Sequence, residues 1–341
     1  MPIPVRPRTS SYCRVILLLL PLALTAALPG CTRTPQQLEA RGDELLSEGR
    51  FGQAMAAYKK AVELSPEDLG LKLKVAGAYR DRGLRSEAIE RYETILEEHP
   101  ESLEARRELA LLLAAEGLRT RAMEQIGILK DRMPGSPVPW KLEARMAQQD
   151  EDWRDAVTHW RQALRRDDQD AEAYHMMGRA HMELGDYPSA LAALQQAVRV
   201  EEGYDDAYFE LGLTLIELNR IDRAEEAYRN YIDTHPRDAQ AYYKLGNALL
   251  SKGYAEQAVE QYRRAVAIRP GYADAHFNLG MALLQQDREE EAAKAFEAVL
   301  IHAARDAVKD NARSMLRVIR QGGREVPEDG VNRLDPLLSR T

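Results

Sequence analysis

Small and large apolar residues recur along the chain with a period of 34 residues. In blocks counted from residue 35, position 8 is glycine or alanine every time, and position 24 is large and apolar or aromatic, from Tyr58 to Phe296. Position 20 is alanine in all eight blocks: Ala54, Ala88, Ala122, Ala156, Ala190, Ala224, Ala258 and Ala292. A period without gaps indicates eight copies of one structural unit.

Each block predicts two short helices. Glycine at position 15 of five blocks indicates the turn between them, and the small residues at positions 8 and 20 allow the helices to pack closely. Proline at position 32 of five blocks ends the second helix. The predicted pairs span residues 35–68, 69–102, 103–136, 137–170, 171–204, 205–238, 239–272 and 273–306. A capping helix is expected at 307–320, with Val308, Ala312, Met315 and Ile319 on its apolar face.

The pattern resembles the tetratricopeptide repeat (TPR), most clearly in "AYYKLGNALLSKGYAEQAVEQYRRAVAIRP" at residues 241–270. The resemblance covers residues 35–306. It implies an all-α solenoid, a right-handed superhelix of eight helix pairs, in which the first helix of each pair lines a concave groove.

Positions 5, 9 and 12 of each first helix are expected to point into this groove. They make its middle basic and its C-terminal third apolar and aromatic, which suits a peptide or helix with an apolar side and an acidic flank. The alternative is that the aromatic residues at position 5 only pack within the repeat. The predicted partner-binding residues are Arg107, Lys141, Arg145, Arg179, Phe209, Leu213, Tyr243, Asn247, Phe277 and Met281.

Two further segments depart from the repeat. "MPGSPVPW" (133–140) places three prolines at the boundary between the third and fourth blocks, which predicts a local change in superhelix pitch, with a variant repeat as the alternative. Residues 321–341 combine glycine, proline and mixed charge and are predicted to be disordered. Their three leucines, Leu334, Leu337 and Leu338, would otherwise form a short docking motif.

The N-terminus reads as a targeting signal. Residues 1–14 carry three arginines and no acidic residue, and the apolar run at 15–27 is 13 residues long, shorter than the roughly 20 needed to cross a bilayer. The run leads into Leu28-Pro29-Gly30-Cys31, which resembles a bacterial lipoprotein signal. The resemblance implies removal of residues 1–30, lipidation of Cys31 and a short tether at 31–34. Thr32 favours the periplasmic face of the outer membrane. A plain signal peptide that leaves a free Cys31 is the alternative.

Charge and motifs limit the remaining functions. The formal net charge is −8 and there is no basic stripe, which argues against nucleic acid as a partner. The sequence has no catalytic constellation and no metal-ligand spacing, so we expect no enzyme activity, no metal, no cofactor and no small-molecule substrate. The predicted function is a lipid-anchored scaffold that binds segments of other envelope proteins. The alternative is an assembly factor for a secretion, type IV pilus or exopolysaccharide export system, resembling the TPR lipoproteins that act as pilotins.

Overall fold

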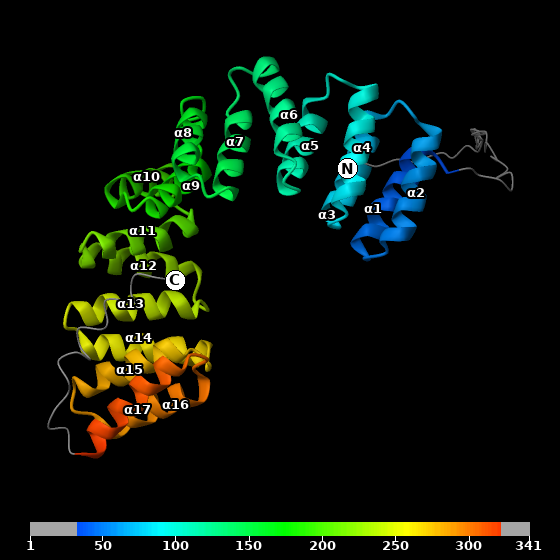
Figure 1. Cartoon of the computed structure of the whole chain (residues 1–341). Helices are drawn as coiled ribbons and strands as arrows, with labels where there is room; N and C mark the ends of the chain where they lie inside the picture. Colours follow the sequence, from blue (N-terminus) through cyan, green and yellow to red (C-terminus); the bar gives the residue numbers. More distant parts are fainter. Residues whose placement is uncertain (1–32, 322–341) are drawn as a thin grey trace, which may run out of the picture. The chain divides into compact units, whose positions relative to one another are not determined.

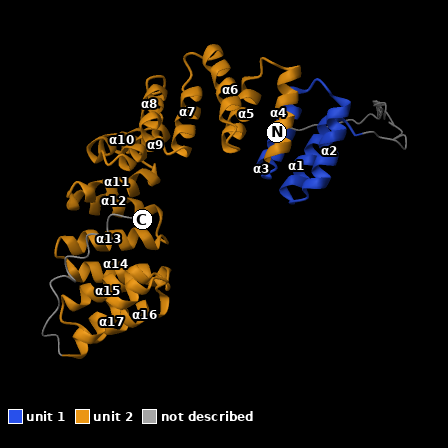
Figure 2. Ribbon diagram, viewed as in Figure 1, with its two compact units in different colours: residues 1–84 blue, residues 85–341 orange. Residues whose placement is uncertain are grey.

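The computed structural model describes residues 33–321, and these residues form 17 α-helices and no β-strand (Figure 1). The chain divides into two compact units, residues 1–84 and 85–341 (Figure 2). The boundary falls between the two helices of the second 34-residue block. Within each unit, every helix packs against the next helix along the chain. Cys31, which is predicted to be lipidated, the predicted signal segment and residues 322–341 lie outside the described residues.

The helices follow the 34-residue period. In the first unit they are α1 (Pro35–Ser47), α2 (Phe51–Leu64) and α3 (Leu69–Asp81). In the second unit they are α4 (Arg85–Glu98), α5 (Leu103–Ala115), α6 (Arg119–Arg132), α7 (Val138–Gln149), α8 (Trp153–Leu164), α9 (Ala171–Glu183), α10 (Tyr187–Val200), α11 (Asp205–Glu217), α12 (Ile221–Thr234), α13 (Ala239–Ser251), α14 (Ala255–Ile268), α15 (Ala273–Leu284), α16 (Glu289–His302) and α17 (Asp306–Arg320).

The turn between the helices of a pair depends on one left-handed residue at position 15. Across residues 33–321, all eight residues with positive φ lie at this position. Five are glycines, which adopt this conformation without steric cost. The other three are Glu151, Asn219 and Asp287, with φ between 54° and 58°. The same backbone turn is therefore kept where the sequence has no glycine.

Side-chain caps mark the start of several helices, whereas others, such as α11 and α15, begin without one. Asp170 and Asp238, for example, accept hydrogen bonds from backbone N–H groups in the first turns of α9 and α13. Thr34 and Gln37 form a capping box at α1. These caps satisfy backbone donors that the helix itself leaves free.

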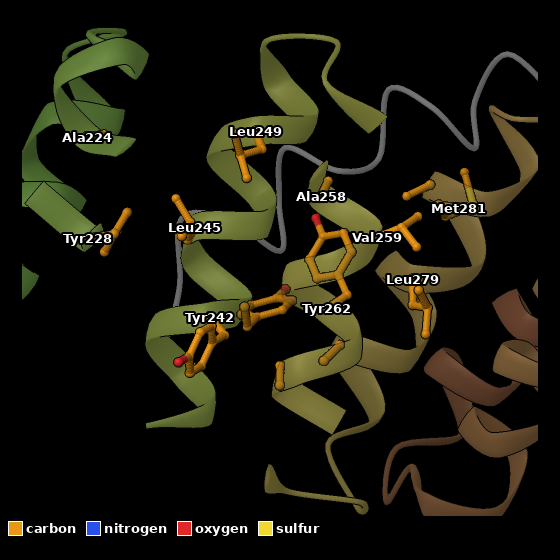
Figure 3. Close-up of a cluster of buried hydrophobic side chains, with 14 of the residues drawn as sticks. Ala224, Tyr228, Tyr242, Leu245, Leu249, Ala258, Val259, Tyr262, Leu279 and Met281 are labelled. Carbon is orange, nitrogen blue, oxygen red and sulfur yellow. The ribbon is translucent and has the colours of Figure 1, made fainter. Parts of the chain in front are cut away.

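The large residue at position 24 fills the space between the two helices of a pair. The rings of Tyr58, Trp160, Tyr228, Tyr262 and Phe296 are fully buried. Figure 3 shows Tyr262 of α14 among the buried side chains of α13, α14 and α15. A Cβ atom added to Gly246 would lie 2.6 Å from Cε1 of Tyr262, so this pair requires glycine at position 8. The helix spacing is thus set by a ring packed against a residue that lacks a side chain.

The last helix covers the end of the array. In α17, Ala312, Met315 and Leu316 are buried, and Val308 and Ile319 pack against the same apolar cluster. Charged residues occupy the opposite face of the helix, as expected of a cap that separates a stacked core from water.

The proline-rich joint is held by an ion-pair network around one buried carboxylate. Between α6 and α7, residues 133–137 form the connection, and Pro139 lies in the first turn of α7, where proline is tolerated. The buried carboxylate of Glu143 lies 2.6 Å from Lys130 Nζ and 3.1 Å from His159 Nδ1, which links α7 to both neighbouring helices. The change in superhelix pitch expected here stays a prediction.

Candidate functional site

Neighbouring first helices contact one another at three places in the second unit. Contacts join α5 to α7, α9 to α11 and α13 to α15. We define the first-helix face as the side chains at positions 5, 9 and 12 of α5, α7, α9, α11, α13 and α15. All ten predicted partner-binding residues lie at these positions.

The basic middle of this face is neutralised by carboxylates. Lys141 Nζ lies 2.8 Å from both Asp170 Oδ2 and Glu172 Oε2, and Arg145 Nη2 lies 2.6 Å from Glu172 Oε1. The other two predicted cations are also paired: Arg107 with Glu108 (2.6 Å) and Arg179 with Glu210 (3.0 Å). The predicted basic middle is therefore paired with carboxylates, and partner binding by these four cations stays a prediction. The prediction considered positions 5, 9 and 12 alone, whereas the carboxylates come mostly from the next repeat.

The ion pairs in this cluster alter the pKa values of their members. Burial lowers the pKa of Lys141, but hydrogen bonds to Asp170 and Glu172 outweigh burial and raise the pKa above its usual range. Burial raises the pKa of Glu172, but Lys141 and Arg145 outweigh it and hold the pKa below its usual range. Both groups stay charged across the neutral range, so the cluster stabilises contact between α7 and α9.

Replacing Glu172 tests this cluster. Glu172→Gln is expected to lower the free energy of unfolding at pH 7 by about 1 kcal/mol, because Arg145 loses its partner and Lys141 keeps only Asp170. A carboxyl group whose pKa is lowered by folding stabilises the protein fully above its unfolded-state pKa. This stabilisation is lost as the pH falls through its folded-state pKa. Urea unfolding of both proteins at neutral and acidic pH measures the difference, which should shrink on acidification.

The exposed Glu183 on the same helix provides the control. Glu183→Gln should change stability little at either pH. A difference between wild type and Glu172→Gln that is equally large in acid would contradict the ion-pair account.

The side chain at position 6 reaches back to positions 5 and 9 of the preceding repeat. Glu210 lies 2.8 Å from His175 Nε2 and 3.0 Å from Arg179 Nε. One pair of repeats later, Asn278 Nδ2 donates to Asn247 Oδ1 at 2.9 Å and to Tyr243 Oη at 3.3 Å. In both places, the side chain at position 6 therefore occupies the same slot, between positions 5 and 9 of the preceding first helix.

Three of the six predicted residues in the C-terminal third are buried rather than displayed. Tyr243 and Asn247 are covered by α15 through the contacts of Asn278, and Asn247 Oδ1 also accepts a hydrogen bond from Tyr262 Oη at 2.7 Å. Met281 is 4% exposed. The expectation that these side chains point into the groove fails because neighbouring first helices approach closely. Asn278 at position 6 was the signal in the sequence for this buried polar contact.

The other three remain half-exposed. Phe209, Leu213 and Phe277 pack on the buried cluster of the second unit from one side. The ring of Phe209 lies 5.2 Å from that of Tyr231, and the ring of Phe277 lies 5.5 Å from that of Phe296. At position 12, Ile216, Leu250 and Leu284 are also half-exposed. Rigidly held apolar side chains of this kind are typical anchors for a partner.

Lys244, at position 6 of α13, was missed by the sequence reasoning. Lys244 is 9% exposed, and it makes no hydrogen bond or ion pair with any residue in the described range 33–321. Burial lowers the pKa of its ammonium group, although the charges of Glu217 and Asp274 act in the opposite direction. Its place next to position 5 of α13 follows from the sequence, but its lack of an acceptor does not.

The described residues offer little for other chemistry. Residues 33–321 contain no group of three or more His, Cys, Asp or Glu side chains arranged to hold a metal ion. In the same range, no helix has both the length and the apolar character that crossing a membrane requires.

An array of helix pairs, each closed by a small residue against a large one, defines an α-solenoid. A tetratricopeptide repeat model matches residues 73–127, 175–222, 209–273 and 255–309, and a second model of the same description matches residues 45–95. The first covers more than half of the chain, so the chain belongs to the tetratricopeptide repeat family. The predicted all-α solenoid is confirmed, and the fold is that of TPR protein-interaction scaffolds. No curated protein matches the chain.

Solved structures resemble the chain over different spans. MamA is 26% identical, with 48% of this chain and 96% of MamA covered and a TM-score of 0.47. YrrB, described as a TPR protein with an unusual peptide-binding site, is 20% identical. The match covers 55% of this chain and 97% of YrrB, with a TM-score of 0.51. A chain of the APC/C hetero-tetramer Cut9–Hcn1 is 17% identical. The match covers 83% of this chain and 55% of that chain, with a TM-score of 0.49. The likeness to YrrB supports the fold.

Proposed function

We propose that the chain is a non-enzymatic scaffold that binds a segment of a partner protein on the first-helix face of its second unit. The observation that carries the proposal is the set of half-exposed, firmly packed apolar side chains formed by Phe209, Leu213 and Phe277. An apolar face of this kind suits an extended or helical segment. The shared fold with YrrB, whose described site binds peptide, supports the same class of partner.

A selection from displayed random dodecapeptides tests the proposal. The purified chain should enrich peptides with bulky apolar residues, and the enriched peptides should bind in solution with micromolar affinity. The proposal would be contradicted if no peptide were enriched. It would also be contradicted if substitutions on the first-helix face did not affect peptide binding.

The proposed site of action is the periplasmic face of the outer membrane. The apolar run at 15–27 and the Leu-Pro-Gly-Cys sequence that ends at Cys31 support processing as a lipoprotein. Acyl chains on Cys31 would anchor the chain, since each buried CH₂ contributes about 0.8 kcal/mol. The first helix begins at Pro35, so the tether of four residues reaches about 14 Å at most. The scaffold would then work close to the membrane surface.

Removing the thiol tests the anchor. Cys31→Ser should abolish incorporation of labelled palmitate and move the protein from the membrane fraction to the periplasmic fraction. Cys13→Ser is the matched control, because Cys13 lies in the segment that processing removes, and it should change neither result. Membrane retention of Cys31→Ser would contradict lipid anchoring.

A role in assembling a secretion, type IV pilus or exopolysaccharide export system is the second candidate. The observation that favours it is the lipoprotein-like signal directly followed by repeats, a combination that resembles pilotin lipoproteins. Isolation of the protein from cross-linked membranes separates the two roles. Recovery of a secretin or an export porin supports assembly, whereas recovery of peptidoglycan enzymes supports the general scaffold.

A further inference from the structure

Lys244 is a buried cation that lacks a counter-charge. It lies on α13 with 9% of its surface exposed, and none of residues 33–321 forms a hydrogen bond or ion pair with it. The acidic groups whose charges reach it are Glu217 of α11 and Asp274 of α15, and neither lies within ion-pair distance. The Lys244 side chain is largely buried while Nζ keeps some contact with water, so the cation is partly desolvated and has no acceptor among residues 33–321.

The repeat itself shows what this slot normally holds. Glu210 and Asn278 occupy position 6 in the repeats on either side, and both contact polar side chains at positions 5 and 9 of the preceding repeat. For Lys244, those two positions hold Phe209 and Leu213. Apolar side chains cannot accept a hydrogen bond, so the slot provides a donor and no acceptor.

By the register of the repeat, Lys244 faces positions 5 and 9 of α11, which belong to the proposed peptide-binding surface. Phe209 and Leu213 are half-exposed and pack on the core of the second unit. A partner segment seated on them would bring its own side chains next to Lys244. An acidic side chain in that segment would supply the missing acceptor in a partly desolvated site, where a charge-assisted hydrogen bond is stronger than in water.

We infer that Lys244 binds a single carboxylate of the partner, and that the partner segment carries one aspartate or glutamate between bulky apolar residues that rest on Phe209 and Leu213. The inference rests on the proposed function and adds the chemistry of its ligand. One carboxylate is favoured over a polyanion, since Lys244 offers one charge and the protein as a whole is acidic, with a net charge of −8.

Peptides selected from the random dodecapeptide library provide the first test. Each selected peptide is compared with a version in which its acidic residue is replaced by the matching amide, using fluorescence anisotropy. Wild type should bind the acidic form about 10-fold more tightly or better, as expected for a partly buried charged hydrogen bond. Lys244→Met should bind both forms alike, at the affinity wild type has for the amide form.

Lys252→Met is the matched control. Lys252 follows α13 in the same repeat and is already paired with Asp222 and Glu225. This variant removes the same charge, and it should keep the preference for the acidic peptide. Loss of the preference in Lys252→Met to the same degree as in Lys244→Met would reduce the effect to net charge and overturn the inference.

Supplying the carboxylate from within the chain gives the second test. Leu213→Glu places an acid at position 9, the position from which Arg179 meets Glu210 with the charges reversed. The variant should lose the preference for acidic peptides, and its thermal unfolding midpoint should exceed that of Leu213→Gln by about 2 °C or more. A midpoint no higher than that of Leu213→Gln, together with an unchanged acid preference, would overturn the inference.

The outcomes separate this inference from the function on which it rests. Selected peptides that need Phe209 and Phe277 but bind equally as acid and amide overturn the role of Lys244 and leave the proposed function standing. If no peptide binds, or if substitutions on the first-helix face do not change binding, both the proposed function and the role of Lys244 are overturned.

Discussion

Trp160→Ala is expected to lower the free energy of unfolding of the second unit by about 4 kcal/mol, the cost of removing a large buried ring from a packed core. Trp160 is fully buried at position 24 of the fourth block. It packs among small residues of α7, α8 and α9, including Ala144, Ala156 and Ala173. Alanine side chains cannot extend to refill the space, so the cavity should remain. Urea unfolding followed by circular dichroism at 222 nm measures the loss.

Two controls show that the effect comes from lost volume. Trp160→Phe should cost about 1.5 kcal/mol or less, since it keeps a ring and removes an indole N–H that has no hydrogen-bond acceptor among the described residues. Trp153→Ala removes a half-buried ring at the start of the same helix and should cost less than Trp160→Ala. Equal losses for the two alanine variants would contradict the packing described for position 24.

The double variant Phe209→Ala, Phe277→Ala is expected to weaken binding of a selected peptide by about 100-fold or more, because two anchors of about 2 kcal/mol each would be lost. The two rings stand on α11 and α15 and are half-exposed. Tyr243 is left unchanged in this variant. It is buried and hydrogen-bonded to Asn278, so its removal would disturb the fold as well as the surface. Fluorescence anisotropy with a labelled peptide measures the affinity.

Exposed apolar side chains away from the first-helix face provide the control. Tyr254 and Ile268 mark the two ends of α14 and are exposed, and the variant Tyr254→Ala, Ile268→Ala removes a comparable apolar surface. Its affinity should match that of wild type. Greater loss in this variant than in Phe209→Ala, Phe277→Ala would move the binding surface to the second helices.

The helix pairs follow from the sequence because one local rule is repeated. A small residue at position 8 faces a large one at position 24, as Gly246 faces Tyr262, and this contact lies within a single block. The 34-residue period therefore predicts each helix pair directly. Position 15 shows that the rule is stronger than residue preference, because Glu151 adopts the left-handed conformation that glycine adopts elsewhere.

The chemistry of the first-helix face could be predicted only in part. Which side chains lie along it follows from the helical period, but their pairing depends on contacts between repeats. Glu172 and Glu210 neutralise cations on the first helix of the preceding repeat. Asn278 covers Asn247 in the same way, because these first helices come within hydrogen-bonding distance. These distances depend on how each pair stacks on the next, which a pattern read one helix at a time does not contain.

The central claim is that a partner segment lies on the first-helix face, and site-specific photo-cross-linking tests it most directly. A photoreactive phenylalanine replaces residue 216 or 250 on that face, or residue 254 or 268 outside it, in the full-length chain expressed in its native host. We predict covalent adducts of one defined partner from positions 216 and 250, with none from 254 and 268. Adducts from 254 and 268 alone would contradict the account.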